Sequence, residues 1–546
     1  MPDDTTTATT TKSPFPHPWW VSYSFREPLP KCKDEWLIND ISNSIREKLE
    51  WRSKYKDPII SEKWKQEVNS SLVGKTKIPN EIISYVLEEL KWYDKMAVNI
   101  GGGFAVGCDP KIVFSDSCIG EETNAELKRL SDLFQLDFGE DIDYHPGSND
   151  TVIDLVHPSL FPLQYGKTPI YGTSDKTKLE MVEFSEDIYK VKEGVSFGTS
   201  KRFQWLPALF ELNLENKNYE IKSYINNLDP IEYTNLYEII AKIFNLIIPG
   251  LNHTLSAYGS TEYLKIEIPI GDDAYEENFM IEFDRKMEEL DMRHPEASDE
   301  EYEALERTKV NGLKKFMPKY PAEPRIDKTI DVKDFQQLKV IVKMANIELT
   351  PDKPRYEGGS WHVEGTINED IVATVLYYYD CENITDSYLK FRCSFGDPNY
   401  PQNDEIYPRE IYGIENEDIM VREIGHVQAL TNRIVVFPNI FQHQVQPFEL
   451  LDKSKPGRRR ILCFFVVDPY NQIVKSTLDV PPQQLHWWEN ESLTQKLGRL
   501  SVADTTKLNK QSLEVAYEIR KQLMEERSPG NDPMCAFSNE FSLCEH

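Results

Sequence analysis

The chain has 546 residues, enough for two to four domains whose cores need no disulfide support. Hydrophobic residues make up 40% of it, which excludes wholesale disorder. Its 62 basic and 91 acidic residues give a formal net charge of −29, which argues against a nucleic-acid partner or an anionic membrane surface.

The cysteines and the N-terminus indicate the compartment. Eight cysteines are scattered along the chain without a CxxC pair, which argues against a zinc ribbon and a disulfide scaffold. The first residues, MPDDTTTATTTK, contain no apolar segment, and no run of 18 apolar residues exists. We therefore expect no signal peptide, no membrane span, and a cytoplasmic or nuclear location.

The first 334 residues divide into a short tail and a mixed region. Residues 1–14 are Thr-rich and predict a disordered tail, and residues 15–334 predict an α/β region. Apolar residues at helical spacing predict helices over residues 34–50, 81–97 and 231–248, the last ended by Pro249-Gly250. Strands or loops are expected over residues 153–161 and 219–228.

An acidic insert spans residues 272–306. It holds 15 acidic and three basic residues, and therefore contributes −12 to the net charge. Ser298 and Glu301 form a capping-box pattern that predicts a helix start. A docking surface for a basic partner is one interpretation, but a solvated helical excursion explains the same composition and is favoured.

Strand-like stretches dominate the chain from residue 335 onward. They are rich in Val, Ile, Tyr and Phe and are separated by turn residues, over 338–350, 370–380, 388–395, 423–430, 432–438, 441–450 and 459–468. So many short strands in succession predict a sandwich or barrel over residues 335–475. Residues 476–546 predict a helical extension, with a helix over residues 501–524.

Candidate metal ligands stand in two blocks of this region. His362 and Glu364 lie two residues apart in GGSWHVEG, so a strand would point both to one face. The second block carries His443 after an apolar strand and a Pro438-Asn439 turn. Two histidines and one carboxylate form the facial triad that leaves positions open on Fe(II).

Three consecutive arginines begin the last apolar stretch, at Arg458, Arg459 and Arg460. A buried strand does not begin with cations unless one of them meets an anion. An arginine suits a two-pronged grip on a carboxylate. Successive residues of a strand face opposite ways, so Arg459 lies on the face opposite to its two neighbours.

In this order, the blocks resemble the Fe(II)/2-oxoglutarate-dependent dioxygenases, and most closely their prolyl-hydroxylase-like branch. That resemblance implies a double-stranded β-helix, also called a jelly roll, with Fe(II) on His362, Glu364 and His443. It implies that Arg459, nine residues before Asp468, and Tyr378, sixteen residues after His362, bind the distal carboxylate of 2-oxoglutarate.

Other residues of this region have open or different assignments. Tyr356 is a further candidate for cosubstrate contact, although packing is the favoured interpretation. Glu364 stands where Asp is commoner, and the interval from His443 to the arginines is long, which leaves the choice among the arginines open. His426 is the competing second histidine, and His145 and His157 each precede a proline and are interpreted as turn residues.

The whole chain resembles a large fungal family known as the domain of unknown function 4246 family. The segments that carry the resemblance are HPGSNDTVIDLVHPSLFPLQYG, FQWLP, SYINNL, GGSWHVEG and IVATVLYYYD. This second resemblance covers about residues 25–490 and implies no reaction.

The sequence as a whole predicts an α+β protein with a jelly-roll core, a large α/β N-terminal region and a helical C-terminal tail. The expected activity is hydroxylation of a small molecule or a protein side chain, with 2-oxoglutarate and dioxygen converted to succinate and carbon dioxide. The alternatives are a non-catalytic scaffold that retains the barrel and a zinc-dependent hydrolase with the same three ligands.

Overall fold

The structure is a computed structural model that describes residues 13–18, 28–172, 175, 177–185, 198–269, 271–294, 296–401, 404–489, 507–527 and 540–543. Within these residues, helices and antiparallel strands are mixed, which confirms the α+β prediction. The predicted disordered tail lies outside the described residues except for Ser13 and Pro14. Among the described helices, none combines the length and apolar character that crossing a membrane requires.

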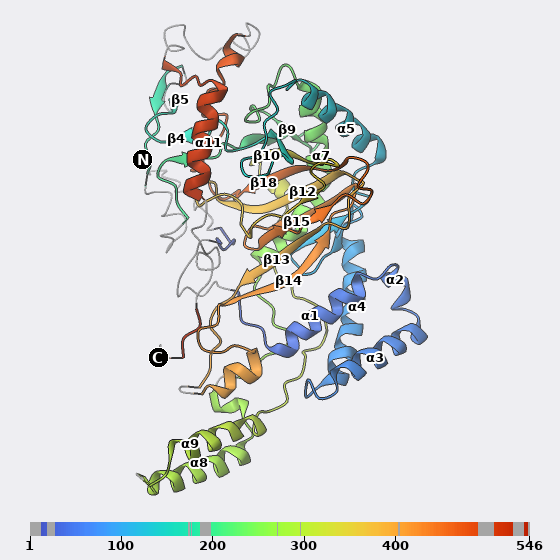
Figure 1. Cartoon of the computed structure of the whole chain (residues 1–546), viewed down its shortest axis with the longest axis vertical. Coiled ribbons are helices and arrows are strands. Elements are labelled where there is room, and N and C mark those ends of the chain that lie inside the picture. Colours follow the sequence, from blue (N-terminus) through green and yellow to red (C-terminus); the bar gives the residue numbers. More distant parts are fainter. Residues whose placement is uncertain are drawn as a thin grey trace, which may run out of the picture.

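A large antiparallel sheet runs through the middle of the molecule (Figure 1). Its described strands follow the order β1-β2-β15-β12-β18-β10-β8-β9, and β3 also pairs with β10. Four of them confirm predicted strands: β10 (Gln337–Leu349), β12 (Ile371–Glu382), β15 (Arg433–Pro438) and β18 (Gly457–Val467).

The other strands of this sheet come from the first 334 residues. They are β1 (Ala105–Val106), β2 (Val113–Ser115), β3 (Val152–Val156), β8 (Ala208–Leu212) and β9 (Tyr219–Ile221). The N-terminal region is therefore hydrogen-bonded into the same sheet as the strand-rich region. The division into domains at residue 335 stays a prediction.

A smaller sheet faces the large one. Its order is β14-β13-β16, with bounds Val421–Gln428, Tyr388–Ser394 and Gln442–Val445. The predicted strand over 441–450 is wrong as one element: it divides at Pro447, which has no N–H to donate, into β16 and β17 (Phe448–Glu449). β17 pairs with β11 (Arg355–Tyr356), whereas β16 pairs with β13.

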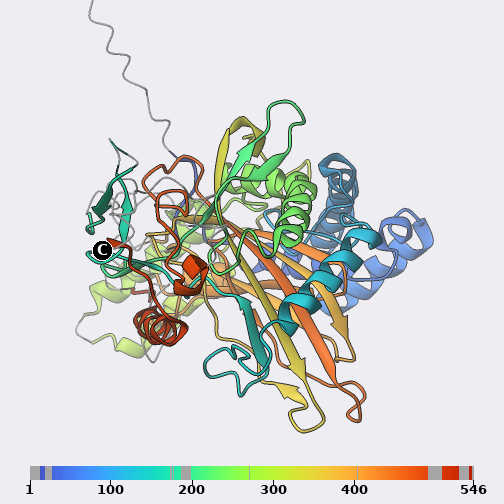
Figure 2. The same cartoon turned by 90° about the horizontal axis from the view of Figure 1, so that it is seen from above.

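Alternation along β18 places two cores on the two faces of the large sheet. Leu462 and Phe464 belong to the core that includes residues of helices α5 (Glu121–Leu136) and α7 (Thr234–Gly259). Cys463 and Phe465 belong to the core that the small sheet shares. In Figure 2 the teal helix α5 crosses over the strands of this sheet. The large sheet is thus covered by helices on one face and by the small sheet on the other.

Two of the three predicted N-terminal helices are confirmed, as α1 (Lys33–Arg46) and α4 (Pro79–Ile100), and α2 (Trp51–Lys54) and α3 (Pro58–Leu72) lie between them. The predicted end of the third helix at Pro249 is wrong, because α7 continues to Gly259. The buried side chains of Leu251 and Leu255 hold the second half of α7 against the core, which offsets the backbone hydrogen bond that Pro249 cannot make.

The acidic insert forms an arm that projects from the rest of the molecule (Figure 1). It contains α8 (Glu277–Met292) and α9 (Asp299–Glu306), and the predicted capping box of Ser298 and Glu301 is present. The basic partner proposed for residues 272–306 stays a prediction.

The C-terminal helix α11 (Leu513–Arg527) begins later than predicted, and residues 501–506 lie outside the described chain. The remaining strands are β4 (Leu163–Gln164), β5 (Pro169–Tyr171), β6 (Leu179–Met181) and β7 (Phe203–Gln204). Short helical turns cover Gly271–Ala274, Arg307–Asn311, Val332–Asp334, Pro408–Tyr412 and Leu485–Glu489.

Candidate metal centre

Two backbone segments hold the candidate histidines beside each other. His443 lies on β16, and its N–H donates to the carbonyl of His362 at 2.9 Å. The N–H of His362 donates back to the carbonyl of His443 at 3.2 Å. This reciprocal pair fixes the register and leaves the ring centroids of the two imidazoles 4.3 Å apart.

Glu364 completes the cluster. Its Oε1 atom lies 3.3 Å from Nε2 of His443 and 3.7 Å from Nε2 of His362. All three ligand atoms lie within 4.8 Å of one another. Ligands bound about 2.1 Å from one ion at adjacent positions lie about 3 Å apart, so small side-chain movements would close this group on a metal. The structure brings together the three residues that the sequence analysis selected as ligands.

The neighbours of the cluster fix its orientation. Nδ1 of His362 lies 2.8 Å from the carbonyl of Ser360, which favours a proton on Nδ1 and directs the lone pair of Nε2 toward Glu364. Asn439, in the turn after β15, bonds the backbone of Glu364 in both directions at 2.8 Å. The ring of Phe437 packs edge-on against His443. The Phe-Pro-Asn turn therefore positions two of the three candidate ligands.

The three candidate ligands differ in how deeply they are buried. The side chain of His443 is 3% exposed, that of Glu364 13% and that of His362 40%, so the site opens on the side of His362. Burial raises the pKa of Glu364, but the hydrogen bonds and charges of the two histidines outweigh it and hold that pKa well below its usual value. Glu364 is therefore an ionised acceptor, the form in which a carboxylate binds a metal.

Arg459 is a buried cation on the inner face of β18. It is 2% exposed, and its Nε is buried without a hydrogen-bond partner. Its NH1 donates to Oγ of Ser387 at 2.8 Å, and no acidic side chain of the described residues pairs with it. Its guanidinium lies 5.4 Å from the ring centroid of Tyr378, whose hydroxyl is also buried without a partner. Burial raises the pKa of Tyr378 to about 12, so its hydroxyl keeps a proton to donate.

The two neighbouring arginines have acidic partners. Arg458 pairs with Asp380 at 2.6 Å and with Glu382 at 2.8 Å. Arg460 pairs with Asp132 and with Glu348. The side chain of Arg460 is buried, and these two pairs neutralise its charge. Arg459 lies on the opposite face from both, as the alternation predicts.

The remaining candidates take different places. Tyr356 packs on Phe448 with centroids 5.3 Å apart, and Phe448 lies 5.1 Å from the guanidinium of Arg459, so Tyr356 is one ring removed from that cation. His426 lies on the surface beside Glu47 and Tyr388, outside the cluster of His362, Glu364 and His443.

Two family models match most of the chain. The family described as "Protein of unknown function (DUF4246)" matches residues 80–491, and the "Domain of unknown function DUF4246, N-terminal" matches residues 1–67. The chain belongs to the DUF4246 family. Every candidate site residue of this DUF4246 member falls within the longer match. A search of curated proteins finds no match.

Solved structures resemble parts of the chain only distantly. IDO from Bacillus thuringiensis shares 16% identity over 25% of this chain and 48% of its own, with a TM-score of 0.16. A bsmA homolog from Methylobium petroleophilum PM1 shares 8% identity over 24% and 42%, with a TM-score of 0.16. These two matches span less than half of the neighbour's length. The Fe(II)/(alpha)ketoglutarate-dependent dioxygenase TqaL shares 10% identity over 73% and 93%, with a TM-score of 0.26. Scores this low do not identify an activity.

Lys343 is a cation near the site that the sequence analysis missed. It lies opposite Cys463 on the neighbouring strand, and Cys463 follows Arg459 by four residues on the same face. Burial lowers the pKa of Lys343, but the carboxylates of Asp154 and Glu364 outweigh it and raise that pKa. Its position in the middle of an apolar strand is the sequence signal that could have identified Lys343.

A second histidine–carboxylate cluster was also missed. Its members are His145, Asp154 and His157, whose ligand atoms lie within 4.8 Å of one another. Nδ1 of His145 lies 2.8 Å from Oδ2 of Asp154. Arg520 of α11 donates to the two carboxylate oxygens of Asp143, each at 2.8 Å, and approaches Asp154 at 3.4 Å. The two histidines do precede turns, but the interpretation of them as turn residues alone was incomplete.

Proposed function

We propose that this protein is an Fe(II)/2-oxoglutarate-dependent dioxygenase that hydroxylates a C–H bond of a small molecule or a protein side chain. The observation that carries the proposal is Arg459, a buried guanidinium without an acidic partner among the described residues, beside the unpartnered hydroxyl of Tyr378. A buried cation of this kind calls for an anion, and a carboxylate matches its two-pronged geometry.

The strand arrangement supports a double-stranded β-helix. Along the chain, β12 lies in the large sheet, β13 and β14 in the small one, β15 in the large, β16 in the small and β18 in the large. Such crossing between two facing antiparallel sheets is the pattern of a jelly roll. In this arrangement β16 and the segment of His362 lie side by side, which places the candidate ligands on one strand pair.

Each residue then has a defined task. His362, Glu364 and His443 would hold Fe(II), and their one-sided arrangement leaves positions for 2-oxoglutarate and dioxygen. When bound, the metal and cosubstrate supply the oxidation, which yields succinate and carbon dioxide. Arg459 and Tyr378 would orient the distal carboxylate of 2-oxoglutarate. Tyr356 supports them through Phe448.

Cys463 of β18 is close to both the candidate cosubstrate cation and one of the candidate ligands. Burial raises the pKa of Cys463 to about 12, and its thiol also senses the charges of Lys343, Glu364 and Arg459. Cys463 follows Arg459 by four residues on the same face of β18. A short dicarboxylate that binds a metal at one end and Arg459 at the other requires the two groups on one face of the sheet. A zinc hydrolase with the same ligands leaves Arg459 without a task.

The test is the binding of 2-oxoglutarate to the Arg459→Ala variant. Losing a buried charge pair costs about 2–5 kcal/mol, which at about 1.4 kcal/mol per tenfold predicts affinity weaker by roughly 30-fold or more. Calorimetry with Mn(II) in place of iron measures this binding, and the Mn(II) affinity itself should not change. Arg458→Ala is the matched control: its half-exposed guanidinium lies on the opposite face of β18 and pairs with Asp380 and Glu382, so we expect a change of about threefold or less in the affinity for 2-oxoglutarate.

Two outcomes would redirect the proposal. If Arg459→Ala binds 2-oxoglutarate as well as the wild type does, the cosubstrate assignment fails and the zinc alternative moves ahead. If the wild type binds neither Mn(II) nor Fe(II), the scaffold alternative is favoured.

A further inference from the structure

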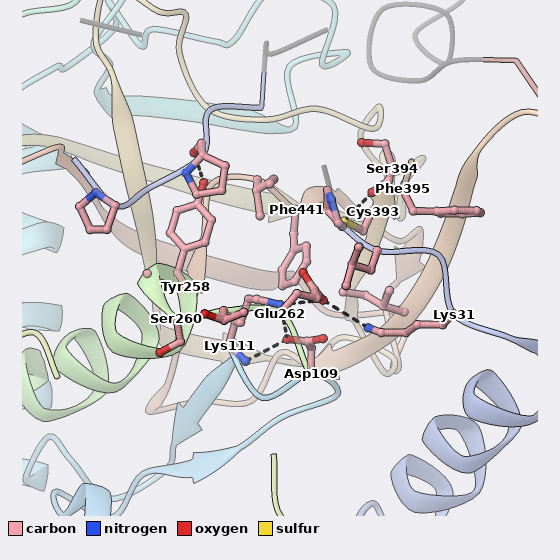
Figure 3. A pocket seen from close by; sticks show the side chains of 18 of the residues that line it. Lys31, Asp109, Lys111, Tyr258, Ser260, Glu262, Cys393, Ser394, Phe395 and Phe441 are labelled. Atoms are coloured by element: carbon pink, nitrogen blue, oxygen red, sulfur yellow. Dashed lines mark hydrogen bonds and ion pairs between the residues drawn. The ribbon is translucent and has the colours of Figure 1, made fainter. Parts of the chain in front are cut away.

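A cavity of about 500 Å³ lies apart from the candidate metal centre. Its walls come from the small sheet, the C-terminal end of α7, the loop between β1 and β2, the start of α1 and residues 13–16 and 28–31 before it (Figure 3). None of His362, Glu364 and His443 lines it. Its volume is within the range that small-molecule sites occupy.

Four charged side chains gather along one side of this cavity, and the exposed Lys328 also lines it. Figure 3 shows Lys31, Asp109, Lys111 and Glu262 together there. Burial raises the pKa of Asp109, but the nearby lysines, Lys111 first, outweigh it and lower that pKa, so Asp109 is ionised. The group contains two positive and two negative charges. Its formal sum is zero, which favours neither a simple anion nor a metal cation.

The four charges are loosely paired. Oε1 of Glu262 lies 3.8 Å from Nζ of Lys31 and 3.5 Å from Nζ of Lys111. Oδ1 of Asp109 lies 3.9 Å from Nζ of Lys111. Charge-assisted N–H···O bonds are about 2.7–2.9 Å long, so these contacts leave room for shorter bonds to another molecule. The four side chains balance one another's charge, and their ammonium and carboxylate groups can still form hydrogen bonds to a bound molecule.

Aromatic and apolar side chains lie beside these charges: the ring of Phe441 is 5.7 Å from Nζ of Lys111. Phe441 and Tyr258 reach into the space, and Phe395 and Cys393 close it beyond them (Figure 3). Trp36 adds a further ring beneath Lys31, 5.1 Å from its Nζ. A guest that fills this cavity therefore meets charges of both signs with aromatic rings beside them.

We propose that this cavity binds a zwitterionic α-amino acid with an apolar or aromatic side chain. Its carboxylate would lie against Lys31 and Lys111, its ammonium group against Glu262, and its side chain against Phe441. A zwitterion satisfies both signs of charge at once, whereas a simple anion or cation leaves one pair of charges unmatched and partly desolvated. The site does not depend on the proposed oxygenase activity.

The first experiment measures the binding of L-phenylalanine, L-tyrosine, L-leucine and L-methionine to the full-length, metal-free protein by calorimetry. At least one should bind with a millimolar or lower Kd. Its N-acetyl derivative, which lacks the ammonium charge, and its amide, which lacks the carboxylate, should each bind weaker by about 10-fold or more, since a hydrogen bond to a charged group is lost. If none of the four binds, or if the derivatives bind equally well, the proposal is wrong.

The second experiment locates the site. Glu262→Gln removes one charge with little change of shape and should weaken binding by about 10-fold or more. Glu267→Gln, at an exposed glutamate outside the cavity, is the matched control and should leave the Kd unchanged. His362→Ala should also leave it unchanged, which separates this site from the metal centre. Equal binding by Glu262→Gln and wild type would overturn the location.

Discussion

Two clusters of the same composition lie in different surroundings. Each contains two histidines and one carboxylate within 4.8 Å. In the cluster of His362, Glu364 and His443, the carboxylate faces two imidazoles and the site opens on one side. In the other cluster, Asp154 is also approached by the guanidinium of Arg520.

We infer from this difference that ligand type and spacing do not by themselves make a metal site. An arginine beside a carboxylate supplies the positive charge that a metal would otherwise supply, and it opposes the entry of a second cation. Arg520 also connects α11 to Asp143 in the loop before β3. We infer that the second cluster fastens the C-terminal helix to the sheet, whereas the first is free to take a metal.

The largest expected effect is the loss of Arg520. Arg520→Met keeps most of the apolar stem but leaves Asp143 buried without its guanidinium partner, which predicts a fall of about 3–5 kcal/mol in the free energy of unfolding. Urea unfolding measures it. Lys521→Met, at the exposed neighbouring position of the same helix, is the control and should stay within about 0.5 kcal/mol of wild type. A loss below about 1 kcal/mol in Arg520→Met would contradict the fastening role.

The next effect separates the clusters by metal affinity. His443→Ala should weaken Mn(II) or Fe(II) binding by more than about 100-fold, because the loss of a ligand exceeds the 10- to 100-fold cost of losing an outer partner. Glu364→Ala and His362→Ala should do the same. His157→Ala is the matched substitution in the other cluster and should leave the affinity unchanged.

Metal analysis and calorimetry measure these affinities, with circular dichroism to verify folding. Wild type should take up one equivalent of metal. If wild type binds a second equivalent of metal that is lost in His157→Ala, the second cluster also binds metal and the contrast is wrong. If folded His443→Ala keeps full metal occupancy, His443 is not a ligand.

The strand-rich half of the fold was predictable because its signals are local. The stretch that became β12 is a run of β-branched and aromatic residues, and such runs specify strands wherever both faces are buried. The three candidate ligands could also be selected from the sequence, since each stands in a short motif and strand pairing brings them together. Alternation put Arg459 on the opposite face from Arg458 and Arg460, but it did not choose between the two faces.

The rest depended on contacts between distant segments. Nothing near Pro249 shows that α7 continues, because the packing that offsets the proline comes from the sheet. No residue near Asp154 in the sequence predicts its contact with Arg520, which lies 366 positions later in the chain. The pairing of β8 with β10 joins segments from both sides of residue 335. Local pattern cannot specify such contacts, since they form only when the whole chain is compact.

The smallest expected effect concerns the pH dependence of the second cluster. Burial lowers the pKa of His157 to about 3, and the opposing attraction of Asp154 does not restore it. Below about pH 6.5, His157 therefore binds a proton in the unfolded chain but not in the folded protein. The free energy of unfolding keeps its full value above that pH and falls as the pH decreases. The neutral ring also accepts the N–H of Ser159 at Nδ1, which protonation would prevent. Urea unfolding of metal-free protein between about pH 6 and pH 5 should show wild type losing about 1 kcal/mol more than His157→Asn, whose amide oxygen can still accept but does not titrate. His426→Asn, at an exposed histidine, should follow the wild-type slope, and the same slope in His157→Asn would show that His157 is not the titrating group.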